Sequence, residues 1–362
     1  MTALLVLSAM LLAFSTGAND NFKGFATVWG SGTLSYRRAL TLATIATLAG
    51  SLVSLLVAST LVQQFSGKGL VSSAVVSDPT FIVSVGLAAA ATVLMATRAG
   101  LPVSTTHALM GALLGAGLAH GAGNVNFTKL TGTFLLPLLV SPVLAGALGF
   151  AAFRLMRLRN QARDCACVTG ATVQLSGAGA GTGASALRVA LPQLVIASAA
   201  ECRTLPEPIM KVGLARLLDR THTLSAASIC FARGVNDTPK LVAILLAASV
   251  FDAKVSIGMV AAVMAFGGLL YARRVAETMS QRMVKLDHTQ GLAANLITAV
   301  LVLFASKLGV PVSTTHVSVG SIAGTGFASG FVDRTTLRNI GLSWVGTLPL
   351  AGAIAFAFAC VL

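Results

Sequence analysis

Long apolar runs without a single charged residue recur along this sequence, and they limit its fold more than any other feature. Examples are residues 39–63, 81–97, 130–153 and 341–362. Several runs reach the roughly 20 residues that an α-helix needs to cross the hydrocarbon core of a bilayer. The runs do not alternate between polar and apolar residues, as the strands of a membrane β-barrel would. The sequence therefore predicts an all-α polytopic membrane protein.

The few charged residues agree with this class of protein. They make up 10% of the chain, against roughly 25% in soluble domains. The net charge is +14, but the basic residues lie in short loops between the apolar runs, as the positive-inside rule expects of a membrane protein. We therefore expect a lipid bilayer around the chain and no nucleic acid as a partner.

Two motifs occur twice and in the same order, which indicates two homologous halves. The hexapeptide PVSTTH spans residues 102–107 and again residues 311–316, an offset of 209 residues. The pattern G-x-N-D-x-x-K spans residues 17–23 and again residues 234–240, an offset of 217 residues. Six identical residues in each of two places are far beyond chance.

The joint between the halves lies in a stretch that is basic at its start and glycine-rich later. Arginines cluster after residue 153, and GAGAGTG follows at residues 177–183, which is typical of a flexible connector. We therefore assign residues 1–153 to the first repeat, residues 154–220 to a connecting region with the start of the second half, and residues 221–362 to the second repeat.

Basic loops lie at opposite ends of the two halves, which predicts that the halves are inverted in the membrane. Arg37 and Arg38 follow the first G-x-N-D motif, whereas the matching loop of the second half has no net charge. In the next loop the pattern reverses: residues 273–288 hold four basic residues, and residues 63–78 hold one. Cytoplasmic basic loops put the central loop inside and both termini outside. Transporters built from inverted repeats bind substrate near the midplane, between the repeats.

Asp20 and Asp237 take matching places in the two G-x-N-D motifs, beside long apolar runs. An ionisable residue at membrane depth is costly and by default indicates a function. The simpler interpretation, that each aspartate only caps a helix at the interface, does not explain why the whole motif is repeated. Glycine, asparagine and aspartate permit a break in a helix, and a break is tolerated where it lines a cavity. We expect such a break at each motif, with the carboxylates holding a cation or a proton.

The PVSTTH segments are suited to the first turn of a helix, where the missing N–H of proline costs nothing. The free N–H groups of a helix N-terminus attract anions, and neighbouring hydroxyls add donors. Two half-helices entering from opposite sides would meet around one tetrahedral oxyanion. The alternative is that the hydroxyls bond within their own helices and serve packing. We assign substrate binding to Ser104, Thr105, Thr106, Ser313, Thr314 and Thr315.

Histidines and lysines end the repeated motifs. His107 and His316 either orient the hydroxyls, titrate near neutral pH, or form structural hydrogen bonds. Lys23 and Lys240 each follow an aspartate by three residues, about one helical turn, so that a buried ion pair would be neutral. The alternatives are that the lysines help to hold the substrate or extend to the membrane interface.

At these motifs the chain resembles the PiT family of inorganic phosphate transporters, which carry a G-A-N-D segment near the start of each half and a P-V-S-T-T-H segment later. Besides both hexapeptides, the matching residues are Gly17, Ala18, Asn19, Asp20, Gly234, Asn236 and Asp237. The resemblance implies two inverted repeats with discontinuous helices and re-entrant hairpins, in about 10–12 membrane segments. It also implies phosphate between the repeats, with Asn19 and Asn236 assisting the hydroxyls and Asp20 and Asp237 serving the coupling ion.

Lys23 departs from the sodium-coupled members of that family, which have asparagine at this position. Proton-coupled bacterial members are similar to this chain in carrying N-D-x-x-K-G in one half. A fixed ammonium can take the electrostatic role of a sodium ion, and we assign ion or proton coupling to Lys23 and Lys240 together with the two aspartates. The expected function is alternating-access, proton-coupled phosphate transport in a plasma membrane. The alternatives are a sulfate permease of the same fold and a sodium-coupled phosphate symporter.

Other classes of protein fit the repeated motifs less well. A catalytic site is one asymmetric constellation, so matched residues in both halves favour a binding site, and we expect neither an enzyme nor a cofactor beyond the coupling ion, H⁺ or Na⁺. A channel and a homo-oligomer stay open as alternatives. Cys165, Cys167 and Cys202 are interpreted as incidental thiols, with a metal site as the weaker alternative. Residues 201–220 are predicted to form an amphipathic helix at the membrane surface.

Overall fold

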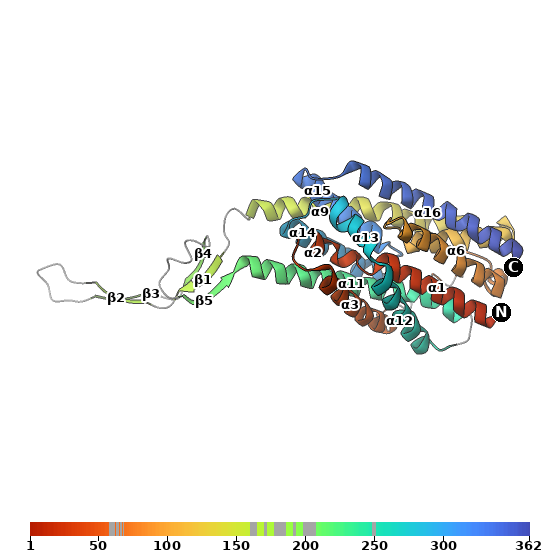
Figure 1. Ribbon diagram of the computed structural model, residues 1–362, viewed down its shortest axis with the longest axis horizontal. Coiled ribbons are helices and arrows are strands. Elements are labelled where there is room, and N and C mark those ends of the chain that lie inside the picture. Colours follow the sequence, from red (N-terminus) through yellow and green to blue (C-terminus); the bar gives the residue numbers. More distant parts are fainter. Residues whose placement is uncertain are drawn as a thin grey trace, which may run out of the picture. The chain divides into compact units, whose positions relative to one another are not determined.

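Ten helices of fifteen or more residues dominate the described chain (Figure 1). They are α1 (Thr2–Asp20), α3 (Tyr36–Val57), α6 (Pro79–Arg98), α7 (Thr105–Ala119), α9 (Leu136–Arg159), α11 (Leu214–Ala247), α12 (Ala253–Tyr271), α14 (His288–Lys307), α15 (Thr314–Ser329) and α16 (Arg334–Val361). Six segments, which include all or most of α1, α6, α9, α12, α14 and α16, are long and apolar enough to cross a membrane. The prediction of an all-α polytopic membrane protein is confirmed.

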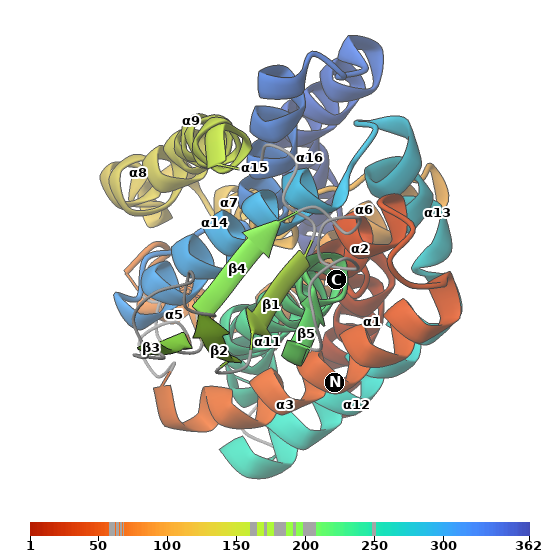
Figure 2. The same cartoon turned by 90° about the vertical axis from the view of Figure 1, so that its left-hand side faces the viewer.

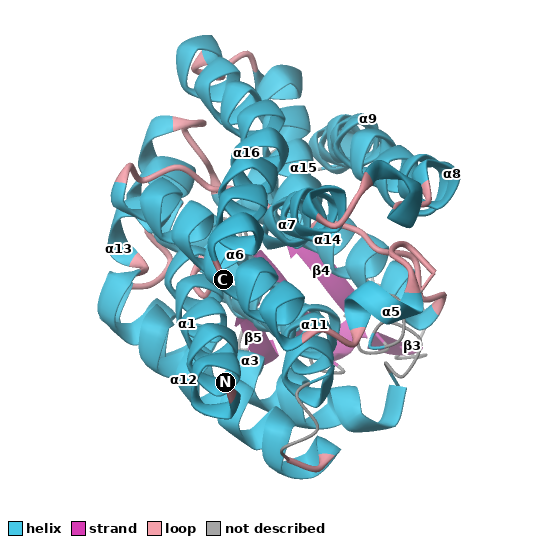
Figure 3. Cartoon of the chain, turned by 90° about the vertical axis from the view of Figure 1, so that its right-hand side faces the viewer, coloured by secondary structure: helices cyan, strands magenta, loops and turns pink. Residues whose placement is uncertain are grey.

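The computed structural model describes residues 1–57, 62, 65, 67, 69–159, 165–169, 172–176, 186–190, 193–197, 208–247 and 251–362. These residues form two compact units, one of Met1–Arg154 with His222–Leu362 and one of Leu155–Thr221. Helices make up nearly all of the regular structure in the first unit (Figure 3). Cys202 and the predicted glycine-rich connector lie outside the described residues.

Short helical elements join the long helices of the first unit. They are η1 (Lys23–Phe25), α2 (Ala26–Gly30), α5 (Ser73–Val76), η2 (Ala122–Asn124), α8 (Phe127–Lys129), the π-helix η3 (Leu130–Leu135), α13 (Arg273–Glu277) and the π-helix η4 (Thr278–Arg282). Aspartates begin four of the long helices. The side chains of Asp78, Asp252, Asp287 and Asp333 each accept a bond from a first-turn backbone N–H, which satisfies a donor that the helix cannot pair itself.

Two hairpins of helices contain the PVSTTH segments at their turns. The first joins α6 to α7 and the second joins α14 to α15, and the helices of each pair are in contact. Gly100 and Gly309 open the turns with φ angles of 71° and 68°, a left-handed conformation that favours glycine after a helix end. Because α7 and α15 have 15 and 16 residues, they are shorter than the roughly 20 residues that span a bilayer.

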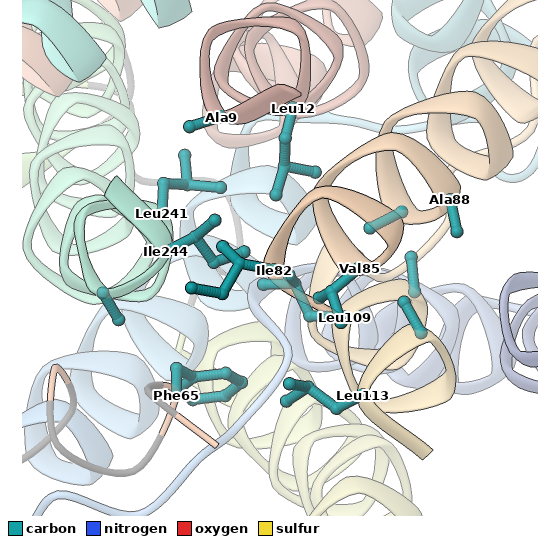
Figure 4. Packing of buried hydrophobic residues seen from close by; sticks show 14 of the residues in the cluster. Ala9, Leu12, Phe65, Ile82, Val85, Ala88, Leu109, Leu113, Leu241 and Ile244 are labelled. Atoms are coloured by element: carbon teal, nitrogen blue, oxygen red, sulfur yellow. The ribbon is translucent and has the colours of Figure 1, made fainter. Parts of the chain in front are cut away.

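The apolar core of the first unit forms where helices from both ends of the sequence pack together. Helix α1 contacts α6 and α12, α7 contacts α16, and α3 lies beside α12 (Figure 2). Figure 4 shows part of the largest cluster, with Leu12 of α1, Ile82 of α6, Leu109 of α7 and Ile244 of α11 turned toward one another. Between helices in a bilayer, such side chains stabilise the fold through close van der Waals packing rather than through removal from water.

The two motif glycines lie inside helices and allow close packing. A Cβ atom on Gly17 of α1 would lie 1.9 Å from the carbonyl oxygen of Met264 in α12, and one on Gly234 of α11 would lie 2.3 Å from that of Thr47 in α3. Met264 follows Thr47 by 217 residues, as Gly234 follows Gly17. The two contacts are therefore a matched pair, and these glycines serve packing rather than a helix break.

The expected break after each N-D pair is found only at the first motif. Helix α1 ends at Asp20, and the chain continues through a turn into η1. The second motif lies inside α11, a continuous helix of 34 residues that includes Pro239. The prediction of a break at Asp237 was wrong because Gly234, which permits a break, instead stays helical and lets α11 pack closely against α3, and α11 also continues through Pro239.

The second unit is built from short antiparallel strands. They are β1 (Cys165–Thr169), β2 (Thr172–Ser176), β3 (Ala186–Ala190), β4 (Gln193–Ala197) and β5 (Pro208–Gly213), in one sheet of order β4-β1-β5 and a separate β2-β3 pair. The predicted amphipathic helix over residues 201–220 is wrong for β5, and α11 begins only at Leu214. Cys165 and Cys167 lie on the central strand β1.

Candidate functional site

All fourteen residues singled out in the sequence are buried in the first unit, each with at most 8% of its surface exposed. They come from the end of α1, from η1, from α11 and from the first turns of α7 and α15. These residues are Asn19, Asp20, Lys23, Ser104, Thr105, Thr106, His107, Asn236, Asp237, Lys240, Ser313, Thr314, Thr315 and His316.

Lys23 joins its own motif to both PVSTTH segments. Its ammonium forms a buried ion pair with Oδ1 of Asp20. It also donates to the carbonyl oxygen of Val103 at 2.8 Å and to Oγ1 of Thr315 at 2.5 Å. An ammonium has three N–H donors and no acceptor, so these three contacts use its whole capacity. The interface interpretation of this lysine is excluded, because the side chain is 2% exposed.

Lys240 repeats this arrangement from the other half of the sequence. Its ammonium contacts Oδ1 of Asp237 at 3.0 Å, Oγ1 of Thr106 at 3.0 Å and the carbonyl oxygen of Val312 at 3.2 Å. Each lysine thus pairs with the aspartate of its own motif and with a hydroxyl of the other half. The two ammonium groups have the same ligand set: one carboxylate, one carbonyl and one hydroxyl oxygen.

The threonine hydroxyls of the two hexapeptides lie beside the ion pairs, whereas the serine hydroxyls have a separate role. Thr105 Oγ1 lies 3.4 Å from Oδ2 of Asp20, and Thr314 Oγ1 lies 3.5 Å from Oδ2 of Asp237. Thr106 and Thr315 contact the lysines, so the two hexapeptides together place four threonine hydroxyls at the two ion pairs.

The serines of the hexapeptides are helix caps. Ser104 accepts a bond from the backbone N–H of His107 at 3.1 Å, and Ser313 accepts one from that of His316 at 3.2 Å. Each serine thereby satisfies one donor at a helix N-terminus. We predicted that these hydroxyls bind substrate, with bonding inside their own helices as the alternative. The observed contacts of both serines are those of the alternative.

Asn19 and Asn236 fasten the two motifs to the turns of the hairpins. Asn19 donates through Nδ2 to Oγ1 of Thr97 at 2.9 Å and accepts at Oδ1 from the N–H of Val103 at 3.2 Å. Asn236 accepts at Oδ1 from the hydroxyl of Ser306 at 3.3 Å. Thr97 and Ser306 are 209 residues apart, the offset of the hexapeptides, so the partners are matched, although Asn19 donates and Asn236 accepts.

His107 and His316 meet behind the threonines, where α7 and α15 come together. Their ring centroids are 4.5 Å apart and their planes are inclined at 75°. Nδ1 of His316 bonds to the carbonyl oxygen of Leu138 at 3.1 Å, and the ring lies 3.9 Å from that of Trp344. Trp344 donates to the carbonyl oxygen of Pro102 at 3.0 Å. His316 therefore links the turn of the second hairpin to α9 through Leu138 and to α16 through Trp344.

Sequence reasoning missed Arg233, which is 1% exposed on α11. Its Nη2 donates to Oδ1 of Asn21 at 3.0 Å and to Oγ1 of Thr47 at 2.7 Å. The signal was present, because an arginine directly before the motif glycine, inside an apolar run, is as unusual at membrane depth as the aspartates. Asn21 and Thr47 belong to no repeated pattern, so only the fold identifies them as partners of Arg233.

The buried charges of the site are nearly balanced. The buried charged side chains of the described chain are Asp20, Lys23, Arg233, Asp237 and Lys240. Three formal positive charges thus face two negative ones. Within the described residues, no group of three or more His, Cys, Asp or Glu side chains is placed to hold a metal ion.

Comparison with known proteins gives a consistent result. A family model described as the phosphate transporter family matches residues 16–355. A protein of Pyrococcus abyssi that carries the provisional name of a phosphate permease is 27% identical, over 97% of this chain and 95% of its own length. The chloroplastic inorganic phosphate transporter 2-1 of Arabidopsis thaliana is 28% identical, over 98% of this chain and 70% of its own.

A solved structure shares the fold. It is titled the sodium-dependent phosphate transporter, and it superposes with a TM-score of 0.76 over 99% of this chain and 98% of its own. The sequence identity is 23%, so this likeness concerns the fold.

Proposed function

This chain belongs to the phosphate transporter family, and we propose that it moves inorganic phosphate across the plasma membrane by proton-coupled alternating access. One observation carries the proposal beyond the family. The ammonium groups of Lys23 and Lys240 each occupy a set of carboxylate, carbonyl and hydroxyl oxygens that joins the two halves. In transporters with discontinuous helices, backbone carbonyl oxygens coordinate the coupling cation, and here each lysine takes one carbonyl oxygen in its set.

The substrate pocket in this proposal lies between the first turns of α7 and α15. Helix N-termini supply backbone N–H groups and a positive dipole end. The Thr106 hydroxyl accepts a bond from Lys240 and keeps its own hydrogen to donate to an anion oxygen. Thr105 and Thr314 donate to the carboxylates over long distances, and in this proposal both hydroxyls turn from the carboxylates to the anion when it binds. A tetrahedral anion with several acceptor oxygens suits this set of donors.

The coupling step in this proposal uses the two carboxylates. Asp20 holds Lys23, and Lys23 in turn holds Thr315 of the other half. A proton on Asp20 removes the negative charge that attracts the ammonium, and this weakens a link between the halves. A proton on Asp237 has the same effect on Lys240 and Thr106. Protonation and release of these links would alternate access to the pocket without a sodium ion.

The topology we propose is inverted, with residues 1–153 and 221–362 as the two repeats. The matched contacts at the two offsets support repeats of the same structure, and the placement of the basic loops supports the inversion. The connecting region, residues 154–220, then lies in the cytoplasm and both termini lie outside. Substrate would bind between the repeats, near the midplane.

Phosphate is favoured over sulfate by the two aspartates as well as by the family. Near neutral pH phosphate carries a proton and sulfate does not. A carboxylate accepts a hydrogen bond from a protonated oxyanion, whereas it only repels a fully ionised one. Asp20 and Asp237 therefore discriminate in favour of phosphate in this proposal.

Uptake by the purified full-length chain in proteoliposomes tests this function. Radiolabelled phosphate is supplied under an imposed pH gradient, with unlabelled sulfate as the competitor. We expect saturable uptake that sulfate does not reduce. Accumulation of labelled sulfate, without uptake of phosphate, would keep the fold and contradict the proposed substrate.

A further inference from the structure

Arg233 differs from the other buried charged residues of the described chain. Asp20 and Asp237 each pair with a lysine, whereas the polar contacts of the Arg233 guanidinium are to the neutral oxygens of Asn21 and Thr47. Removing an ion from water costs several kcal/mol, which only good pairing repays. A neutral residue at this place would therefore favour stability, and the charge calls for a functional explanation.

Most of the hydrogen-bonding capacity of this guanidinium is unused. A guanidinium has five N–H donors, and Nη2 directs its two at Asn21 and Thr47. The buried Nε and Nη1 atoms have no partner within the described residues. Buried donors are almost always paired in folded proteins, and charged ones are the most costly to leave unmade. The chemistry that satisfies several N–H groups of a guanidinium is an oxyanion.

Arg233 also breaks the match between the two halves. The residue 217 positions earlier is Thr16, so the first half has no cation at the corresponding place. The remaining buried charges, two carboxylates and two ammonium groups, sum to zero. Arg233 therefore gives the site its single net positive charge.

The position of Arg233 connects it to both aspartates of the site. It precedes Asp237 by four residues on the continuous helix α11, so the two side chains lie on the same helix face. Through Asn21 it holds the residue next to Asp20 in the chain, and it is within the range of Coulombic interaction with Asp20 and Lys23. A charge at this place acts on any anion that binds at the ion pairs.

We propose that Arg233 binds the transported oxyanion as its counter-charge, with the free Nε and Nη1 groups donating to anion oxygens. The proposal rests on the proposed function in assuming that an oxyanion binds here, and it adds the residue that neutralises it. A singly charged oxyanion, such as dihydrogen phosphate, makes the loaded site neutral without a bound sodium ion.

Binding of inorganic phosphate to the purified full-length chain tests this proposal, measured by isothermal titration calorimetry together with the melting temperature. Arg233→Gln removes the charge and should raise the Kd about tenfold or more. Arg233→Lys keeps the charge and loses the planar donors, and its Kd should lie between those of the original protein and Arg233→Gln. Thr47→Val removes one acceptor of the guanidinium and keeps its charge, so it should leave the Kd within about twofold.

If Arg233 only braces the fold and does not contact the anion, the variants should differ in another way. In that case Arg233→Gln and Thr47→Val would lower the melting temperature and leave the Kd of both variants unchanged, or would raise the Kd equally. Either result overturns the proposal. If Arg233→Gln does not fold, the Kd values of Arg233→Lys and Thr47→Val are compared instead. The proposal predicts weaker phosphate binding for Arg233→Lys alone, and equal Kd values would overturn it.

The same titrations separate this proposal from the proposed function. Phosphate that binds Arg233→Gln as tightly as the original protein would overturn the role of Arg233 and leave phosphate transport standing. Sulfate that binds in place of phosphate, and more weakly in Arg233→Gln, would overturn the substrate and support the role of Arg233. No binding of either anion by the original protein would overturn both.

Discussion

Replacement of Lys23 by methionine tests the buried ion pairs most directly. Methionine keeps the apolar stem and removes the ammonium, so that the Asp20 carboxylate, with 1% of its side chain exposed, stays buried without its cation. The carbonyl of Val103 and the hydroxyl of Thr315 lose the same donor. Removing one partner of a buried pair costs about 3–5 kcal/mol, and we expect Lys23→Met to reduce the free energy of unfolding by about that amount.

A double-mutant cycle isolates the pair from the loss of packing. Asp20→Leu combined with Lys23→Met removes both charges, so no uncompensated ion is left. The double variant should be more stable than the sum of the single changes predicts, by about 0.5–3 kcal/mol. Stability is measured by thermal unfolding of the detergent-purified protein.

A lysine at the surface supplies the matched control. Lys254 is exposed at the start of α12, and Lys254→Met should change stability by no more than about 0.5 kcal/mol. If Lys23→Met is as mild as Lys254→Met, or if the double variant shows no interaction energy, the ion pair is not part of the folded protein.

Two further predictions concern helix packing and a helix cap. Gly234→Ala places a Cβ atom 2.3 Å from the carbonyl oxygen of Thr47 and should lower the melting temperature. Gly341→Ala, where nothing lies within 4 Å of the added atom, should not; equal effects would refute the packing argument. Hydrogen bonds from the first turn of α6 lower the pKa of Asp78, which lies outside the membrane span. Its contribution to stability is present above the unfolded pKa and is lost as pH falls through the folded one, so Asp78→Ala should destabilise more at pH 7 than at acid pH. An equal loss at both pH values would contradict this account.

The sequence was sufficient to predict the parts of the site that are repeated. Asp20, Asp237, Lys23 and Lys240 stand in matching motifs beside apolar runs, and the ion pairs follow from their spacing of one helical turn. The hairpin turns follow from proline and hydroxyl residues at a helix start. Helical spacing and repeated motifs can both be read directly from the sequence, without knowledge of the fold.

The contacts between distant segments could not be predicted in this way. That Lys23 reaches Thr315, 292 residues away, depends on how the helices pack. The same packing turns the motif glycines toward neighbouring helices and leaves α11 unbroken at Asp237. Arg233 occurs once, so no repeat drew attention to it. The strands of the second unit lie in a stretch whose glycine-rich composition predicted a connector.

Phosphate uptake without sodium is the measurement that tests the central claim most directly. The purified chain is reconstituted in liposomes with a pH-sensitive dye inside and potassium as the alkali cation on both sides. If Lys23 and Lys240 take the place of a coupling cation, added phosphate should enter and acidify the interior, and sodium should change neither signal. If no phosphate enters until sodium is added, the lysines do not replace that ion and the account of coupling is wrong.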